Sequence, residues 1–186
     1  MSHNGLMQRV AIFGTSGAGK TTLAQRISEK VDLCHIEVDG IFHQANWTPL
    51  DEATFLQRIE EKTQVPRWVT DGNYSTVRPL ILARADTVVW LDYARGITIR
   101  RVVQRSLKRA LLRQELWNGN REALSNLFRL DPEVSIICWS WTSHAAVQAT
   151  MSELLNSGAL RHTTVLRFRH PKETNAWFQG LSAAQF

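Results

Sequence analysis

The stretch GTSGAGKT, residues 14–21, decides the fold of this 186-residue chain. It fits the pattern G-x-x-x-x-G-K-[ST], in which a glycine-rich turn joins a buried strand to a helix. The preceding run RVAIFG (9–14) is typical of a buried strand, and the following AGKTTLAQRISEKV (18–31) is typical of a helix. Because the pattern and its context agree, the sequence predicts a loop that binds the phosphates of a nucleotide.

The residue types in this turn suit that role. Glycines at 14, 17 and 19 allow the backbone to bend around a phosphate, and the backbone amides and the helix N-terminus supply partial positive charge. Lys20 can reach the β- and γ-phosphates of ATP, and the Thr21 hydroxyl can ligate Mg²⁺. The predicted ATP-binding residues are Gly14, Thr15, Ser16, Gly17, Ala18, Gly19, Lys20, Thr21 and, as a weaker candidate, Thr22.

Length and composition fit a single folded domain, residues 1–186, with a full core. Hydrophobic residues make up 44% and charged residues 21% of the chain, and no apolar run approaches the roughly 18 residues that indicate a membrane span. The first residues lack the order of charged, apolar and small residues of a secretory signal. Cys34 and Cys138 lack metal-ligand spacing, so we expect two buried, reduced thiols in a cytoplasmic protein with no membrane partner.

Short apolar runs alternate with helical patterns along the chain, which predicts an α/β domain with a mostly parallel sheet. The predicted strands are 9–14, 34–39, 67–72, 86–92 and 163–168. The predicted helices are 18–31, 51–63, 77–84, 95–113, 143–158 and 172–181. In such sheets ligands collect at the carboxyl ends of the strands, so the residues that follow each strand are the candidates for a site.

The third predicted strand ends in VTDGNYS, residues 69–75. Asp71 is suited to hold Mg²⁺ through water beside the loop threonine. Gly72 allows the backbone to approach a substrate, and Asn73 and Tyr74 offer hydrogen bonds or ring stacking. We therefore predict that these four residues contact the substrate, although an ordinary Asp-Gly turn is the plainer interpretation.

The segment VDGIFHQANW, residues 38–47, follows the second predicted strand. Asp39 can accept a proton from, or orient, an acceptor hydroxyl or phosphate, or can simply be a turn acid. His43 and Trp47 can line an acceptor pocket, Trp47 by stacking, and packing or surface roles are the simpler alternative for both. Asp92, which ends the fourth strand, is predicted to cap the long helix behind it, because an anion near a helix N-terminus is favourable.

The net charge of +5 is concentrated in one segment. Between Arg95 and Arg129, nine Arg and Lys residues accompany two acids, a net charge of +7, whereas the rest of the chain carries −2. In RRVVQRSLKRALLR (100–113), residues four apart share one helix face, which is roughly 18 Å long. The arginines of this face are Arg101, Arg105, Arg109 and Arg113.

A solvated helix face is the plain interpretation of these arginines. Beside a phosphate loop, a mobile lid that places some of them over the phosphates is favoured, because phosphoryl transfer spreads negative charge over three oxygens. Arginine also suits this task because its planar fork binds phosphate oxygens in pairs. We expect two or three of the arginines to contact phosphate and the others to be solvated or paired with acids.

Together, GTSGAGKTTLA, VDGIFHQANW, TDGNYS, WLDYARG and RRVVQRSLKR…ELWNGNRE resemble bacterial adenylate-kinase-like P-loop proteins. Many of these are labelled DNA topology modulation proteins, and the resemblance covers about Arg9 to Arg169. It implies a three-layer nucleoside/nucleotide-kinase fold with a five-stranded parallel sheet in the order 2-3-1-4-5. It also implies an acceptor-side segment near 39–65 and a helical, arginine-rich lid near 100–130.

The resemblance assigns roles to single residues. It implies that Gly17, Gly19, Lys20 and Thr21 bind the ATP phosphates, that Asp71 supports Mg²⁺, that the lid supplies Arg101, Arg105 and Arg109, and that Arg169 and His170 flank adenine. Two departures disfavour AMP as the acceptor. Asn-Tyr-Ser follows Gly72 in place of an aromatic residue, proline and arginine, and VDGIFH replaces the threonine-glycine pattern of the AMP pocket. Asp39 instead resembles the acid beside the acceptor hydroxyl in small-molecule kinases of this fold.

The leading hypothesis is a kinase that uses ATP and Mg²⁺ and transfers the γ-phosphoryl group to a nucleotide, a nucleoside or another hydroxyl metabolite. The alternatives are an ATP-dependent switch or ATPase that acts on DNA or a protein, and a slow ATPase with no acceptor. The absence of an N-K-x-D tetrad disfavours a GTPase, and without a helix-turn-helix signature nucleic acid is the less favoured partner. The sequence leaves both monomer and dimer open.

Overall fold

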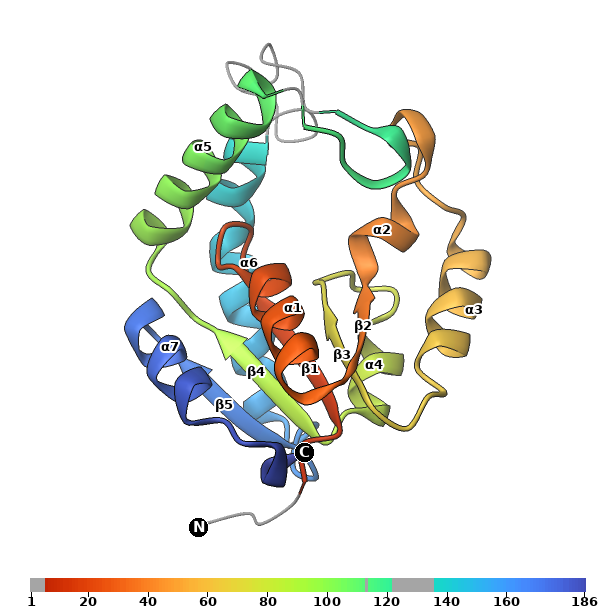
Figure 1. Cartoon of the computed structure of the whole chain (residues 1–186), viewed down its shortest axis with the longest axis vertical. Helices are drawn as coiled ribbons and strands as arrows, with labels where there is room; N and C mark the ends of the chain where they lie inside the picture. Colours follow the sequence, from red (N-terminus) through yellow and green to blue (C-terminus); the bar gives the residue numbers. More distant parts are fainter. Residues whose placement is uncertain (1–5, 113, 122–135) are drawn as a thin grey trace.

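A computed structural model of the chain describes residues 6–112, 114–121 and 136–186 (Figure 1). Its centre is a five-stranded parallel sheet in the order β2-β3-β1-β4-β5, which confirms the predicted α/β class and the strand order. The strands are β1 (Arg9–Gly14), β2 (Cys34–Glu37), β3 (Trp68–Asp71), β4 (Thr87–Leu91) and β5 (Thr164–Phe168).

Helices cover both faces of the sheet and make a three-layer domain (Figure 1). On one face α1 and α7 pack on the sheet, and on the other face α3, α4 and α6 do so. The central strands are therefore buried on both sides, which explains their continuous apolar runs. The helices are α1 (Lys20–Val31), α2 (Val38–Phe42), α3 (Glu52–Lys62), α4 (Arg78–Arg84), α5 (Arg95–Leu111), α6 (Ile136–Asn156) and α7 (Pro171–Gly180). The single-turn 3₁₀ helices are η1 (Ala45–Trp47), η2 (Trp117–Gly119) and η4 (Ala183–Gln185).

The register of the sheet brings the predicted site residues to one edge. Ile12 of β1 pairs with Asp71 at the end of β3, and Asp71 pairs with Glu37 at the end of β2. On the other side of β1, Gly14 pairs with Leu91. The loop after β1 therefore lies between the ends of β3 and β4, where ligands of parallel sheets bind.

Two predicted boundaries are wrong. The second strand was expected over 34–39, but β2 ends at Glu37 and the next five residues form α2, so Asp39 lies in the first turn of a helix. The helix expected over 143–158 is α6, Ile136–Asn156, in the described residues, and it packs against α5. Its first turns include buried Ser140, so tertiary packing supports helix where the local pattern is ambiguous.

Two expectations about single residues are also wrong. Cys34 and Cys138 are free thiols, but Cys34 is exposed, because it begins an edge strand, and Cys138 is only half-buried. Asp92 does not cap α5, whose N-cap is Ala94. Its carboxylate instead accepts hydrogen bonds from Arg167 at 2.6 Å and 2.9 Å, and a third from a glutamine of α6.

The described ranges contain no helix that is both long enough and apolar enough to span a bilayer.

Candidate functional site

The turn after β1 has the strand–turn–helix context that its sequence predicts. Gly17 and Gly19 have φ angles of 81° and 93°, a region that side chains rarely adopt, and Gly19 is the N-cap of α1. A Cβ atom on Gly17 would lie 2.3 Å from the carbonyl oxygen of Thr98 in α5. The glycine is therefore needed both for the turn and because the backbone of α5 rests directly on the loop.

Lys20, the first residue of α1, lies half-buried behind this turn. Its ammonium group donates a hydrogen bond to the carbonyl of Thr15 at 3.3 Å. Burial lowers the pKa of Lys20, the carboxylates of Asp39 and Asp71 oppose this, and Arg105 adds to the lowering. The lysine therefore lies between the carboxylates at the strand ends and the cations of α5.

Thr21 and Asp71 meet as predicted. The Thr21 hydroxyl donates a hydrogen bond to Oδ2 of Asp71, and the other carboxylate oxygen lies 3.1 Å from Nε2 of His35. Asp71 is only 2% exposed, so these contacts hold its carboxylate in one orientation. The sequence analysis missed His35, which β2 places beside β3; only the strand pairing reveals it.

The same pair is the candidate for a magnesium site. The described residues contain no group of three or more His, Cys, Asp or Glu side chains that could hold a metal ion by themselves. Mg²⁺ beside a nucleotide does not need such a group, because it takes one or two protein oxygens, waters and phosphate oxygens. The hydroxyl and carboxylate of Thr21 and Asp71 are oxygen donors of the required kind.

Asn73 and Gly72 have structural partners within the chain. The Asn73 amide donates a hydrogen bond to the carbonyl of Gly14 at 2.5 Å, and its oxygen accepts one from the Gly14 amide at 3.4 Å. The side chain therefore ties the end of β3 to the phosphate loop. A Cβ atom on Gly72 would lie 2.9 Å from Cβ of Val38, so this glycine makes room for α2, where we expected it to admit substrate.

Asp39, Tyr74 and His43 form a hydrogen-bonded network. The Tyr74 hydroxyl lies 2.7 Å from Oδ1 of Asp39 and 3.2 Å from Nε2 of His43. Burial and the neighbouring Asp39 raise the pKa of Tyr74, so the phenol stays protonated and donates a hydrogen bond to Asp39. The histidine must then donate from Nε2, because a phenol has only one proton.

Two atoms of this network can still accept a hydrogen bond. Burial lowers the pKa of His43, against the effect of Asp39, so the ring is neutral near pH 7. With Nε2 protonated, Nδ1 is a hydrogen-bond acceptor, and it is buried with no partner among the described residues. Oδ2 of Asp39 makes no hydrogen bond within the same described ranges.

Two matching turns lie above this network. One, which we call the acceptor tip, is residues 43–49, and the other, the lid tip, is residues 115–121. Each is closed by an antiparallel bridge between its first and last residues. Each places an asparagine, Asn46 or Asn118, in the left-handed region with φ of 58° and 56°. Tight turns of this kind expose their tips and leave side chains free to contact a partner.

The two tips dock on each other by hydrogen bonds (Figure 1). Asn120, which is 3% exposed, accepts from the backbone amide of Trp47 and donates to the carbonyl of Gln44, both at 2.8 Å. Asn118 donates to the carbonyls of Gly40 and His43. We call this set of contacts the clasp. The sequence analysis predicted a lid near these residues but not its contact with the acceptor side.

The clasp brings two tryptophans together. Trp117 lies against Gly40, where a Cβ atom would be 2.8 Å from the indole ring; burial raises the pKa of Glu37, and the neighbouring Trp117 indole opposes this. Its ring is nearly parallel to that of His43, with centroids 6.1 Å apart. Trp47 is 37% exposed, and its indole donates to the carbonyl of Arg121. We predicted substrate stacking for Trp47, and the structure gives it this contact in the clasp.

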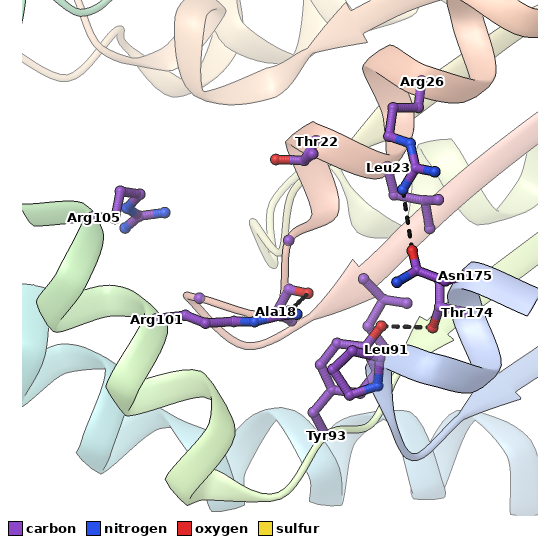
Figure 2. A pocket seen from close by; sticks show the side chains of 13 residues that line it. Ala18, Thr22, Leu23, Arg26, Leu91, Tyr93, Arg101, Arg105, Thr174 and Asn175 are labelled. Carbon is purple, nitrogen blue, oxygen red and sulfur yellow. Dashed lines mark hydrogen bonds between the residues drawn. The ribbon is translucent and has the colours of Figure 1, made fainter. Parts of the chain in front are cut away.

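The arginine face of α5 is turned toward the phosphate loop. Arg101 donates a hydrogen bond to the carbonyl of Ala18 at 3.2 Å (Figure 2), and the Arg105 guanidinium lies 3.5 Å from the hydroxyl of Ser16. Arg109, further along the same face, is half-buried and does not line the cavity described next. Arg113 lies outside the described residues.

A cavity of about 350 Å³ separates the phosphate loop from α5 and α7 (Figure 2). Arg101 and Arg105 project toward it from α5. Its lining residues are Gly17, Ala18, Gly19, Thr22, Leu23, Arg26, Leu91, Tyr93, Arg101, Arg105, Pro171, Thr174 and Asn175. The cavity thus has an apolar part next to β4 and a cationic side.

The residues near the cavity differ from those predicted to flank adenine and lie about one helical turn further along the chain. Arg169 and His170 are exposed and are not among the lining residues; His170 caps α7, and a glutamate of the capping box binds both backbone amides. Pro171, Thr174 and Asn175 in the first turns of α7 line the cavity instead. A hydrogen bond between the hydroxyls of Tyr93 and Thr174 and one from Arg26 to Asn175 hold these side chains (Figure 2).

No known protein family matches this chain, and no curated protein is significantly similar to it in sequence. Its function is therefore inferred from the geometry above.

Proposed function

We propose that this chain is a kinase that transfers the γ-phosphoryl group of ATP to a small acceptor. The observation that carries the proposal is the arrangement around Lys20. Cations of α5 lie on one side of it, and the carboxylates of Asp71 and Asp39 act on it from the strand ends. Phosphoryl transfer needs this combination, because its catalysis is mostly positioning and stabilisation of charge.

The nucleotide is proposed to lie along the phosphate loop with its base in the cavity of about 350 Å³. The backbone amides from Gly17 to Lys20 and the start of α1 offer donors and positive potential to the phosphates. The apolar side chains of Leu23, Leu91 and Pro171 suit the faces of a planar base.

Mg²⁺ is proposed to be held by Thr21 and, through water, by Asp71. When bound, it neutralises charge on the β- and γ-phosphate oxygens. The bond from Asp71 to His35 keeps the carboxylate in its orientation without using the oxygen that faces Thr21.

The protein's own cations act on the transferred group. Arg101 and Arg105 already contact the loop, so a bound γ-phosphate can replace their present partners at little reorganisation. Asp39 is proposed to orient the acceptor hydroxyl and to accept its proton, with Tyr74 fixing the carboxylate from behind.

The proposal is tested by calorimetry and by ADP release. The chain is expected to bind Mg-ATP, and an acceptor is expected to raise ADP release well above the basal rate. Lys20→Ala should abolish turnover or weaken ATP binding. If ATP binds but no acceptor raises turnover, the chain is an ATPase or a switch and not a kinase.

The orientation of α5 also bears on DNA as a partner. Arg101 and Arg105 contact the phosphate loop, so these two arginines of the basic segment are not turned outward to a duplex. The salt dependence of duplex binding separates the hypotheses, because contacts to a DNA backbone weaken steeply with salt.

A further inference from the structure

We infer that the acceptor is an alcohol without a phosphate group, either neutral or cationic, and that nucleoside monophosphates and other phosphomonoesters are excluded. This inference rests on the proposed function and narrows it. The reason is the charge of the acceptor side, where the carboxylates of Glu37, Asp39 and Asp71 gather at the ends of β2 and β3 and in α2.

None of these three carboxylates forms an ion pair with Arg or Lys within the described ranges. Asp71 has hydrogen bonds with Thr21 and His35, and Asp39 has one with Tyr74, whereas Glu37 has the indole of Trp117 as a neighbour. A buried carboxylate is normally compensated by a cation. The acceptor side is therefore anionic, and its compensation must come from Lys20, a metal ion or the substrate.

The effect of the neighbouring carboxylates on the pKa of Glu37 also indicates an anionic acceptor side. Burial raises the pKa of Glu37, the neighbouring Trp117 indole opposes this, and the charges of Asp71 and Asp39 raise it further. A phosphate dianion placed among these groups would meet the same repulsion. Like charges brought together in a recognition site are a strong means of rejecting a wrong partner.

Among the described cations, Arg101 and Arg105 lie across the phosphate loop, whereas Arg78 of α4 donates a hydrogen bond to the backbone carbonyl of Asn73 at 2.8 Å. Arg101 contacts Ala18, and Arg105 contacts Ser16. Arg121, on the lid tip, is exposed and lies 3.5 Å from the carboxylate of Glu115. A bidentate arginine grip is the usual means of holding a phosphomonoester, and the described residues that donate hydrogen bonds to the three acids include no arginine.

The free hydrogen-bonding atoms of the network favour a substrate that carries a hydrogen-bond donor. Oδ2 of Asp39 and the buried Nδ1 of His43 both accept hydrogen bonds, and neither has a partner in the described part of the chain. A hydroxyl or an ammonium group supplies the missing donors, whereas a phosphate dianion supplies only acceptors. Both charge and hydrogen bonding therefore favour the same class of molecule.

The clasp strengthens the preference for an alcohol over a phosphomonoester. Trp117 covers Glu37 and Gly40, and Asn120 is buried between the two tips. Closing the tips excludes water from the acceptor side, and lower polarity strengthens every charge interaction there. An acceptor must lose its hydration shell to enter, which a phosphate dianion does far less readily than an alcohol.

The chemical step is balanced with ATP as the co-reactant. The acceptor oxygen forms a bond to the γ-phosphorus, and the bond between that phosphorus and the β–γ bridging oxygen breaks. The bridging oxygen leaves on ADP with the electron pair. The acceptor proton passes to Oδ2 of Asp39, the oxygen that Tyr74 leaves available.

The experiment uses the full chain with Mg-ATP and matched pairs of acceptors: adenosine with AMP, glycerol with glycerol 3-phosphate, and glucose with glucose 6-phosphate. We expect turnover only with unphosphorylated members, and a preference of about 100-fold or more in kcat/KM over their phosphomonoesters. A preferred phosphomonoester overturns the inference, and so does turnover with neither member of any pair by a chain that binds ATP. Loss of ATP binding is a different result, and it removes the proposed function itself.

Charge variants sharpen the test. Glu37→Gln keeps an oxygen for the Trp117 indole but removes the charge, so the preference over phosphomonoesters should fall at least about tenfold while ATP affinity stays unchanged. Glu153→Gln, an exposed site on α6, is the matched control and should leave the ratio as it is. An unchanged ratio in Glu37→Gln means that charge does not select the acceptor.

Discussion

The two sides of the candidate site are built by different means. The phosphate side consists of backbone amides, glycines and the arginines of α5, and its geometry follows from a turn of eight residues. The acceptor side consists of carboxylates, histidines and aromatic rings from α2, β3 and the two tips. The comparison shows that a local motif sets the conformation of the proposed phosphate side, whereas the proposed acceptor side depends on tertiary contacts.

The two tips also differ in whether local sequence or a tertiary contact supports the backbone conformation. Both turns use two consecutive left-handed residues, but the lid tip has Asn118 and Gly119, whereas the acceptor tip has Asn46 and Trp47. Glycine adopts this backbone freely, and a tryptophan with φ of 59° is strained. The hydrogen bond from the Trp47 amide to Asn120 offsets that strain, so the acceptor tip depends on the lid tip for its conformation.

Arg105→Ala should have the largest effect and should act on the phosphate side alone. If Arg105 stabilises charge in the transition state, the turnover rate should fall by about 10³–10⁵-fold with little change in the Kd of ATP. Single-turnover kinetics together with calorimetry measure both quantities. Arg100→Ala, at an exposed position of the same helix, is the control. An unchanged rate would assign Arg105 to a structural role.

Asp39→Asn should act on the acceptor side alone. The amide oxygen can still accept the hydrogen bond from Tyr74, but the residue can no longer take a proton, so kcat should fall by about 10²–10⁴-fold. ATP affinity, measured by calorimetry, should not weaken. Basal ATP hydrolysis in the absence of acceptor should persist, and its loss in parallel with transfer would contradict a role confined to the acceptor.

Asn120→Ala should break the clasp. The change leaves the amide of Trp47 and the carbonyl of Gln44 without partners, a loss of about 1–3 kcal/mol in the free energy of docking. Hydrogen exchange should quicken in both tips, and the KM of the acceptor should rise while the Kd of ATP holds. Asn156→Ala, at the exposed end of α6, should change neither. Exchange that quickens over the whole chain would mean general destabilisation.

Acid should weaken the acceptor side through His43. Because burial lowers the pKa of His43 below its unfolded value of about 6.5, the folded state prefers the neutral ring. This stability is present above about pH 6.5 and is lost as the pH falls through the lower folded pKa. Urea unfolding at pH 7.5 and pH 5.0 should show a smaller difference for His43→Gln than for the unchanged chain. Exposed His162→Gln serves as the control and should keep the full difference.

The sequence predicted the parts of the fold that depend on local pattern. The alternation of apolar runs predicted the parallel sheet, and the spacing from Arg101 to Arg109 predicted a single helix face. It failed where a partner decides the outcome. Asp92 binds Arg167 and does not cap α5, because β5 lies beside β4.

The sequence by itself determined the conformation of the turn over residues 14–21, since its glycines at 17 and 19 adopt backbone angles that other residues adopt only with strain. Only the tertiary structure decided the acceptor side. Tyr74 meets Asp39 across 35 positions of the chain, and Asn120 meets Trp47 across 73. Contacts of this range depend on the order of strands and on the docking of two tips, and no local periodicity encodes either.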